Sequence, residues 1–452
     1  MSNVKCQIQI LNLKSLRYFV AISTGKLANF IITKIFKRAG STWPGEIALS
    51  LDKNFLKKTF IKNKLTTILI AGTNGKTTTA SLIKFLLEKK NIRVFHNQEG
   101  ANLLNGAVSS VIKYIKLNAK LDYQVAIFEV DENTLPLLVK ELNPSSIILN
   151  NLFRDQLDRY GEVNTIALKW QESLKNLKNC QFFINADDPL LFYISKSFSA
   201  KVYYFGLDRE LMLKKEVSHD VDSIYCPNCG EKLAYHKIAY SHLGDYSCPK
   251  CQFSSPKEIF SLKNPNTQLQ GKYNLYNLNA ASLLVSKIFS FPPAFIQNQL
   301  VDFRPVFGRQ ESFVYQGKKI TIFLGKNPAG FNQAIEVVSQ ISQAKNLLLV
   351  LNDRIPDGRD VSWIWDVDLE RLILYGKKIY VSGDRVYDMG LRLKYCLKNY
   401  QERKFFNFES LREAIETVVE QTRTDEEIFI LATYSGMLEV RKILFKSSIP
   451  FF

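Results

Sequence analysis

Short apolar runs alternate with longer helical stretches from Thr66 to about Phe205. Each run holds four to six residues and is mostly apolar, as is typical of strands buried on both faces. The strands that this pattern predicts are Thr67–Ala71, Ile92–Phe95, Val125–Val130, Ser146–Asn150, Phe182–Asn185 and Val202–Phe205. Strands that alternate with helices indicate a mostly parallel sheet covered on both faces, with functional residues at the carboxyl ends of its strands.

A second α/β rhythm follows Val306 and runs to the end of the chain. Its predicted strands lie near Ile320–Leu324, Leu347–Leu351, Ile379–Val381 and Ile428–Ala432. A chain of 452 residues is too long for one ordinary domain. We therefore expect an α/β fold with three parts: an N-terminal segment over 1–64, one α/β domain over 65–304 with an insert at 222–256, and a second α/β domain over 305–452.

Residues 15–38 are apolar but carry Arg17, Lys26, Lys34 and Lys37. A membrane-spanning helix needs about 20 mostly uncharged residues, and these charges interrupt every such run. The spacing predicts an amphipathic helix that either packs on the protein or lies on a membrane surface. We expect a cytoplasmic protein, with a peripheral position at the inner face of the membrane as the alternative that this helix leaves open.

The charge of the chain is uneven. It has 60 basic and 43 acidic residues, a formal net charge of +17, and residues 1–64 hold twelve Lys or Arg against Glu46 and Asp52. Such a block suits phosphates, nucleic acid or an anionic membrane. A solvated basic surface is an equally good interpretation of the composition alone.

A glycine-bearing turn joins the first predicted strand to a helix. Its two glycines allow successive backbone N–H groups to surround phosphate oxygens at the start of the helix. Lys76 can reach the outer phosphates, and the Thr77 hydroxyl can ligate Mg²⁺. The common P-loop has a glycine five residues before its Gly-Lys pair, where this chain has Ile70. We predict a site for ATP and Mg²⁺ that includes Gly72, Thr73, Asn74, Gly75, Lys76, Thr77 and Thr78.

Two Cys-x-x-Cys pairs interrupt the α/β pattern. Cys226 and Cys229 are separated by eighteen residues from Cys248 and Cys251. This spacing fits one tetrahedral Zn²⁺ held by four thiolates, a closed site that is structural rather than catalytic. Zinc ribbons either bind nucleic acid or brace an insertion. Because acidic residues intermix with the basic ones around these cysteines, we expect no nucleic acid partner.

Several motifs together resemble a known family. The segment GTNGKTTT combines with Glu129 and with the patterns Asn151-x-x-x-Asp155-x-x-Asp158, Asn185-Ala-Asp187-Asp188 and Gly271-x-x-Asn274-x-x-Asn277. These resemble the central ATPase domain of the Mur ligases, which phosphorylate a carboxylate with ATP and let an amine attack the acyl phosphate. The cysteine insert and the segments 97–102 and 357–366 are similar to the MurT family, the Mur ligase-like subunits of lipid II isoglutaminyl synthases. The implied fold is a Mur ligase-type P-loop domain with an inserted zinc ribbon, followed by a Rossmann-like domain.

The resemblance implies roles for individual side chains. Thr77 and Glu129 would share the Mg²⁺, while Asn274 and Asn277 would meet the nucleotide base. Asp187 and Asp188 would lie near that base, although their segment also reads as a plain turn. Arg309 and Lys326 match basic positions that close over the γ-phosphate, and a solvated surface role suits either equally well.

Two departures from the amino-acid-adding Mur ligases affect this interpretation. Gln156 stands where those enzymes have a histidine, which puts a second metal in doubt, and Lys169 falls near their modified lysine but also suits a helix surface. Only about sixty residues precede the P-loop, so their UDP-sugar-binding domain is not expected here. A substrate already linked to a membrane lipid fits that loss.

The chain also lacks the parts of a glutaminase. Such an enzyme needs a cysteine nucleophile and a histidine base, and the four histidines include none beyond His242. The resemblance implies that the glutaminase activity belongs to a separate chain, a GatD-type glutamine amidotransferase. In the family, the residue matching Asp360 is offered to that partner to orient its catalytic histidine. Asp357 and Asp366 are the alternatives, and either suits a helix cap instead.

The predicted activity is therefore ATP-dependent amidation of the D-glutamate α-carboxylate in the lipid II stem peptide, giving D-isoglutamine. The ammonia would come from the partner. An amino-acid-adding ligase of the Mur or folylpolyglutamate type is the first alternative, and a zinc-ribbon nucleic-acid-binding NTPase is the second.

Overall fold

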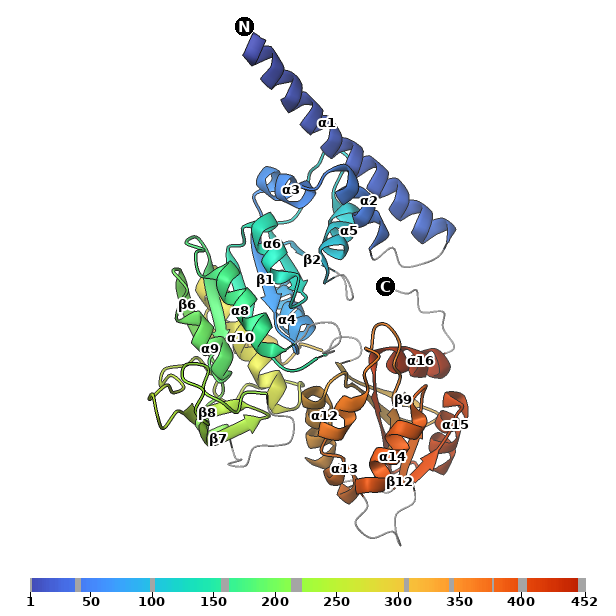
Figure 1. Ribbon diagram of the computed structural model, residues 1–452. Helices are drawn as coiled ribbons and strands as arrows, with labels where there is room; N and C mark the ends of the chain where they lie inside the picture. The colour runs from blue at the N-terminus through green and yellow to red at the C-terminus, as the bar shows by residue number, and fades with distance from the viewer. Residues whose placement is uncertain are drawn as a thin grey trace.

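The computed structural model describes residues 2–36, 42–97, 102–155, 162–212, 222–304, 309–340, 345–375, 378–396 and 405–445. Within these ranges the chain forms two six-stranded sheets, each flanked by helices, and one two-stranded sheet. The N-terminal helix lies across one end of the first sheet domain, and the second sheet domain lies at its other end (Figure 1). The expected α/β fold with a parallel sheet and a second sheet domain is confirmed.

The first sheet is entirely parallel, with strand order β2-β3-β1-β4-β5-β6. Its strands are β1 (Thr66–Ala71), β2 (Val94–His96), β3 (Val125–Val130), β4 (Ser146–Leu149), β5 (Gln181–Asn185) and β6 (Lys201–Phe205). After β1 the chain forms β2 and β3 on one side of that strand, and then β4, β5 and β6 on its other side. Loops that leave neighbouring strands in opposite directions open a crevice at the carboxyl end of β1.

Alternate strand residues face two cores on either side of this sheet. One face is covered by α4 (Lys76–Glu88) and α10 (Lys272–Phe289). The other is covered by α5 (Leu104–Tyr114), α6 (Leu135–Leu142), α8 (Val163–Leu174) and α9 (Pro189–Ser195). Because both faces are buried, the strands are apolar at nearly every position, which is why the sequence pattern revealed them.

The N-terminal segment is helical and is anchored on α5. It consists of α1 (Ser2–Phe30), a π-helical turn η1 (Ile31–Ile35), α2 (Trp43–Leu51) and α3 (Phe55–Asn63). A Cβ at Gly25 would lie 2.7 Å from a side-chain carbon of Ile112, and one at Gly45 would lie 1.9 Å from the carbonyl oxygen of Asn105. The approach to a backbone oxygen at Gly45 needs glycine, whereas the end of the Ile112 side chain could shift to admit a Cβ at Gly25. The helix begins well before the predicted residue 15, since no proline or glycine precedes Gly25. No helix among the described residues has the length and apolarity to cross a bilayer.

The second sheet has the order β13-β12-β11-β14-β10-β9 and is parallel except at β9, which forms a hairpin with β10. Its strands are β9 (Arg309–Tyr315), β10 (Lys318–Leu324), β11 (Lys345–Val350), β12 (Lys378–Ser382), β13 (Phe405–Asn407) and β14 (Glu427–Ala432). One face carries α12 (Pro328–Gln340), α13 (Leu369–Tyr375) and α14 (Val386–Cys396), and the other carries α15 (Leu411–Gln421) and α16 (Tyr434–Phe445).

The cysteine insert packs on the first domain. Its hairpin of β7 (Ala234–Tyr240) and β8 (Leu243–Ser247) carries Tyr246, which shares a small core with Phe253 and with Phe192 of α9. Further short helices are α11 (Pro293–Leu300) and the 3₁₀ turns η2 (Arg209–Leu211) and η3 (Ser362–Asp366).

Polar contacts join the two sheet domains on the side where β1 ends. The side-chain amides of Asn74 and Asn327 lie 3.3 Å apart, and Lys272 lies 3.5 Å from Glu336. Lys326 pairs with Asp155. Residues from both domains therefore meet beside the P-loop.

Candidate active site and cysteine cluster

The turn after β1 has the backbone geometry of a phosphate-binding loop. Gly75 has φ +85°, and a Cβ there would lie 2.1 Å from Asn277 Oδ1. Only glycine therefore fits. α4 begins at the next residue, Lys76, so the free N–H groups of its first turn face the loop. A helix N-terminus of this kind favours phosphate oxygens.

The loop is held by the segment that follows β4. Asn151 accepts from the Asn74 N–H at 2.8 Å and donates to its carbonyl at 3.1 Å, and the Thr73 N–H donates to the Asn151 carbonyl at 3.0 Å. The Thr73 hydroxyl accepts from Phe153 N–H at 3.0 Å. These bonds fix the loop before any ligand binds.

Glu129, near the carboxyl end of β3, faces the start of α4. The Thr77 hydroxyl donates to Glu129 Oε2 at 2.6 Å, and His96 Nε2 lies 2.8 Å from Glu129 Oε1. The Asn97 amide pairs with both backbone groups of Glu129, at 2.8 and 3.0 Å. A hydroxyl and a carboxylate side by side are hard oxygen ligands of the type that Mg²⁺ prefers, so this donor set fits the ion.

Two lysines and two buried carboxylates meet beside the loop. Lys76 donates to the carbonyls of Gly72 and Thr73 and lies 3.7 Å from Glu132 Oε1. Lys326 pairs with Asp155 Oδ2. Burial raises the pKa of Asp155, and the Lys326 ammonium opposes that shift. Glu132 Oε1 and Asp155 Oδ1 accept no hydrogen bond within the described part of the chain. This cluster places two ammonium groups next to the phosphate loop, each beside a carboxylate.

A row of amide side chains runs from α4 to the second domain. Thr79 accepts from Asn150 at 3.2 Å and donates to Asn277 at 3.3 Å. Asn277 donates to Asn274 at 3.2 Å, and Asn274 lies 3.4 Å from Gln310 of β9. The structure thus brings the predicted base-binding pair, Asn274 and Asn277, together next to Gly75.

Asp187 and Asp188 have internal partners. Asp187 accepts from Leu207 N–H at 2.8 Å, from Arg209 at 2.6 Å and from the Tyr276 hydroxyl at 2.8 Å. Burial raises the pKa of Asp187, and Arg209 opposes the shift. Asp188 caps α9 through two backbone N–H groups. These fully buried contacts give both residues a structural role, in agreement with the turn alternative.

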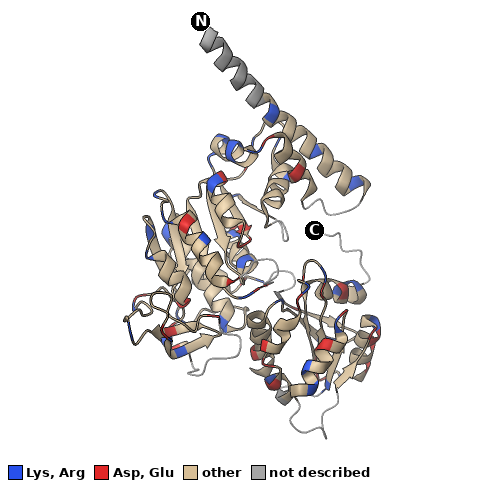
Figure 2. Ribbon diagram, viewed as in Figure 1, with Lys and Arg blue, Asp and Glu red and all other residues tan. Residues whose placement is uncertain are grey.

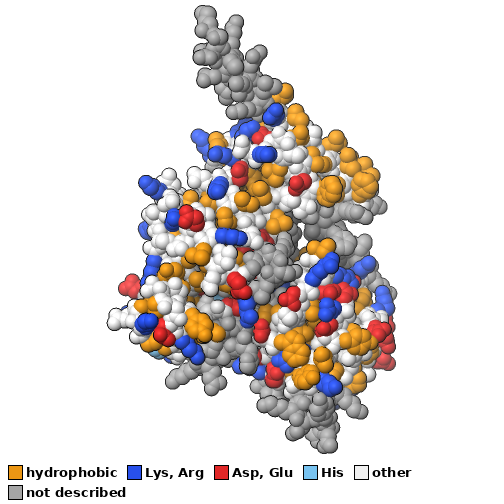
Figure 3. Space-filling view, viewed as in Figure 1, with side chains coloured by type: hydrophobic (Ala, Val, Ile, Leu, Met, Phe, Trp, Pro, Cys, Tyr) orange, Lys and Arg blue, Asp and Glu red, His pale blue; other side chains and the backbone are white. Residues whose placement is uncertain are grey.

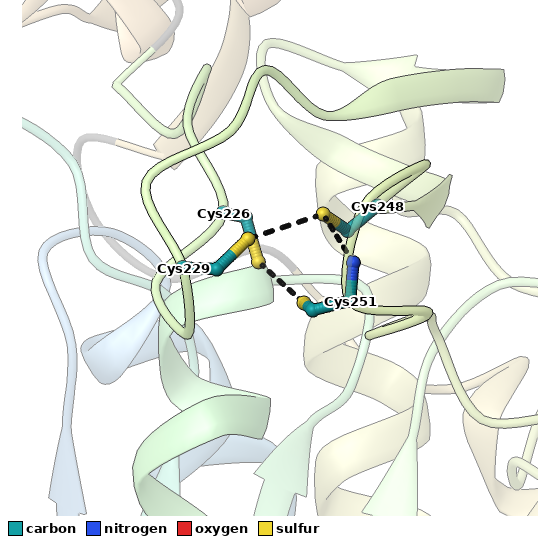
Figure 4. Close-up of side chains that lie close together, drawn as sticks. All are labelled: Cys226, Cys229, Cys248 and Cys251. Carbon is teal, nitrogen blue, oxygen red and sulfur yellow. Dashed lines mark hydrogen bonds between the residues drawn. The ribbon is translucent and has the colours of Figure 1, made fainter.

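The four cysteines of the insert converge on one point (Figure 4). Cys226 Sγ lies 3.5 Å from Cys251 Sγ, Cys229 Sγ lies 3.5 Å from Cys248 Sγ, and all four sulfurs lie within 4.8 Å of one another. Tetrahedral zinc with Zn–S bonds of about 2.3 Å separates its sulfurs by about 3.8 Å. The cluster therefore has the dimensions for one metal ion.

The three aspartates of the segment 357–366 have different surroundings. Asp357 is buried and accepts from Ser435 N–H at 2.8 Å at the start of α16. Asp366 lies 3.3 Å from Arg154 of the first domain. Asp360 is exposed, and its Oδ1 accepts from Ser362 N–H at 2.8 Å. Asp360 is thus the most exposed of the three.

Some expectations lie outside the described residues, and some contacts were not foreseen. Gln156, Asp158 and residues 98–101 are not described, nor is the side chain of Arg309. Lys169 is exposed and lies 3.4 Å from Asn133. His96 and Asn327 carried no predicted role at the site. The sequence signal for His96 was its position at the end of an apolar run. Its contact with Glu129 depends on β2 lying beside β3, and the sequence does not show which strands are neighbours.

Comparisons with known proteins agree with this architecture. The Mur ligase middle domain family matches residues 70–285, and the MurT ligase C-terminal family matches residues 324–437. A Staphylococcus aureus (strain COL) protein named lipid II isoglutaminyl synthase (glutamine-hydrolyzing) subunit MurT is 34% identical over 395 residues, which are 84% of this chain and 88% of the relative. A protein of the same name from Streptococcus pneumoniae is 29% identical over 448 residues, 95% of this chain and 97% of the relative.

Solved structures show the same fold at lower identity. A pseudomurein peptide ligase type C from Methanothermus fervidus aligns with TM-score 0.65 and 21% identity, covering 89% of this chain and 84% of that one. MurF ligase from Thermotoga maritima, solved in complex with ADP, aligns with TM-score 0.60 and 16% identity, covering 88% and 84%. Together with the sequence relatives, these matches establish that the chain belongs to the MurT family of Mur ligase-like enzymes and is an ATP-dependent ligase.

Proposed function

We propose that this chain is the synthetase subunit of a lipid II isoglutaminyl synthase. It would convert the D-glutamate α-carboxylate of the lipid II stem peptide into the amide of D-isoglutamine. The observation that carries the proposal is the Thr77–Glu129 pair at 2.6 Å beside a preformed phosphate loop, in a chain 34% identical to a protein of that name.

The reaction divides into two steps. A carboxylate oxygen of the substrate attacks the γ-phosphorus of ATP, and ADP leaves. Ammonia then attacks the acyl carbon, phosphate leaves, and the nitrogen loses a proton. Both steps develop negative charge on the transferred phosphoryl group, which fixed cations stabilise.

The residues of the site suit these demands. The loop N–H groups and Lys76 would hold the phosphates, and Asn274 and Asn277, which lie together beside Gly75, would meet the base. Thr77 and Glu129 would hold Mg²⁺, which when bound neutralises charge on the outer phosphates. Asp155 keeps the Lys326 ammonium beside the loop, and Arg309 begins the strand that carries Gln310.

The remaining components of the proposal are a partner and a structural metal. A GatD-type glutaminase would deliver ammonia, docked on the C-terminal domain of residues 305–452, with Asp360 orienting its catalytic histidine. The exposure of Asp360 supports this assignment. The cysteine cluster would hold structural Zn²⁺ as a ribbon inside the ATPase domain of residues 65–304. Because lipid II is membrane-bound, the enzyme would work as a cytoplasmic protein at the inner face of the membrane.

The test uses the purified chain with ATP, Mg²⁺, lipid II and ammonium chloride. Mass spectrometry should detect the amidated stem peptide together with stoichiometric ADP and phosphate. Hydroxylamine in place of ammonia should trap the acyl phosphate as a hydroxamate. Product that forms only when an amino acid is added would refute the proposal in favour of an amino-acid-adding ligase.

A further inference from the structure

The helix α1 is apolar on two opposite sides. At about 100° per residue, the buried residues Tyr18, Ala21 and Ile22 share one side of the helix, where they join the core against α5. Leu16, Val20 and Leu27 project from the opposite side and are exposed. A helix that packs on one face normally turns a polar face to water, so this second apolar face needs an explanation.

The exposed face continues beyond the helix into η1 and α2. Phe36 is 64% exposed and Trp43 is 71% exposed, at the two ends of the connection between these elements. Figure 3 shows hydrophobic side chains gathered over this end of α1. We call this surface the N-terminal patch, and it consists of Leu16, Phe19, Val20, Leu27, Phe30, Ile35, Phe36 and Trp43.

The charge around the patch is mostly positive, although Glu46 is exposed on α2, three residues after Trp43. Residues 1–45 contain no Asp or Glu, and the coloured residues along α1 in Figure 2 are all basic. Arg17 and Lys34 are exposed beside the patch. Aromatic and aliphatic side chains with a surplus of positive charge around them complement an anionic bilayer, whose headgroups attract the cations and whose acyl boundary accepts the apolar groups.

The patch is joined to the active site through two helices. Gly45 N–H donates to the Ser109 hydroxyl at 2.8 Å, and Asn105 donates to Glu46 at 3.0 Å, so α2 is fixed on α5. Asn102, just before α5, accepts from Asp131 N–H at 3.1 Å, two residues after Glu129. A surface that holds the patch would therefore hold the catalytic domain in a defined orientation.

We propose that the N-terminal patch lies on an anionic lipid bilayer and keeps the enzyme against the membrane that carries its substrate. The link between this surface and the substrate rests on the proposed function, but binding of the chain to vesicles can be measured whether or not the chain amidates lipid II.

The test compares three versions of the full chain in sedimentation with phosphatidylcholine vesicles, with and without one third phosphatidylglycerol. The patch variant carries Ile35→Ser, Phe36→Ser and Trp43→Ser. The control carries Leu117→Ser, Leu168→Ser and Val314→Ser, which are equally exposed but lie outside the patch. Wild type and control should bind the anionic vesicles, and the patch variant should bind at least about tenfold more weakly. Equal binding by all three, or no binding by wild type, would overturn the proposal.

Two further readouts separate the alternatives. Amidation of lipid II in vesicles should fall in the patch variant, whereas amidation of detergent-dispersed lipid II should not change. If no protein amidates either form, the proposed function fails while the vesicle result still decides the membrane proposal. A wild-type dimer in light scattering that the patch variant abolishes would instead assign the patch to a second copy of the chain and would refute bilayer binding.

Discussion

Replacing Asp360 by asparagine separates the two sources of ammonia. In the structure Asp360 is exposed, and its Oδ1 accepts a hydrogen bond from Ser362 N–H at 2.8 Å, with an oxygen that asparagine also has. Asp360→Asn should therefore change the free energy of unfolding by no more than about 0.5 kcal/mol. The negative charge offered to a partner's imidazole is lost. In a Ser-His-Asp triad, the same exchange lowers turnover about 10⁴-fold, equivalent to about 5 kcal/mol of transition-state stabilisation.

The assay measures amidation of lipid II by the complex with its glutaminase, once with glutamine and once with ammonium chloride. The variant should lose glutamine-driven turnover by several orders of magnitude and keep ammonia-driven turnover. Asp357→Asn is the matched control, because Asp357 is buried and accepts a hydrogen bond from Ser435 N–H. This substitution should lower the free energy of unfolding by about 1–3 kcal/mol and reduce both activities together. Equal retention of both activities in Asp360→Asn would show that Asp360 does not orient the partner's histidine.

Three further predictions concern the nucleotide and metal sites. Glu129→Gln should lower ATP turnover at least about 100-fold and raise the Mg²⁺ concentration needed for half-maximal activity. A Mg²⁺ titration of ADP release measures both effects, and a titration curve equal to wild type would show that Glu129 is not a metal ligand. Gly75→Ala should abolish ATP binding in calorimetry, because its Cβ would meet Asn277, whereas Gly317→Ala, with φ +76° and no atom within 4 Å, should bind normally. Cys226→Ser should lose bound zinc by elemental analysis and lower the Tm by several degrees, and zinc content equal to wild type would exclude the cluster as its site.

The sequence predicted the elements whose residues face only protein. Strands such as Val125–Val130 are apolar throughout because both faces are covered, and their alternation with helices indicated the parallel sheet. β9, with the polar sequence RQESFVY, was not predicted, since it is an edge strand stabilised by its hairpin with β10. β13 has three residues, too few for a periodic signal.

The candidate site was predictable where its residues are close in sequence. The loop from Gly72 to Thr78 could be recognised from its composition alone. The pairing of Lys326 with Asp155 joins residues 171 positions apart, and the contact of His96 with Glu129 depends on which strands are neighbours. Such contacts follow from the three-dimensional arrangement, which no local pattern encodes.

Arg154 connects the cysteine insert to the C-terminal domain. It pairs with Asp222 at the base of the cysteine insert and lies 3.3 Å from Asp366 of the C-terminal domain. Burial raises the pKa of Asp222, and the Arg154 guanidinium opposes that shift. Deleting the insert would remove Asp222 from Arg154. Because Asp222 also holds Arg154 in place through its backbone N–H, removing the insert should weaken the contact of Arg154 with Asp366, which joins the two large domains.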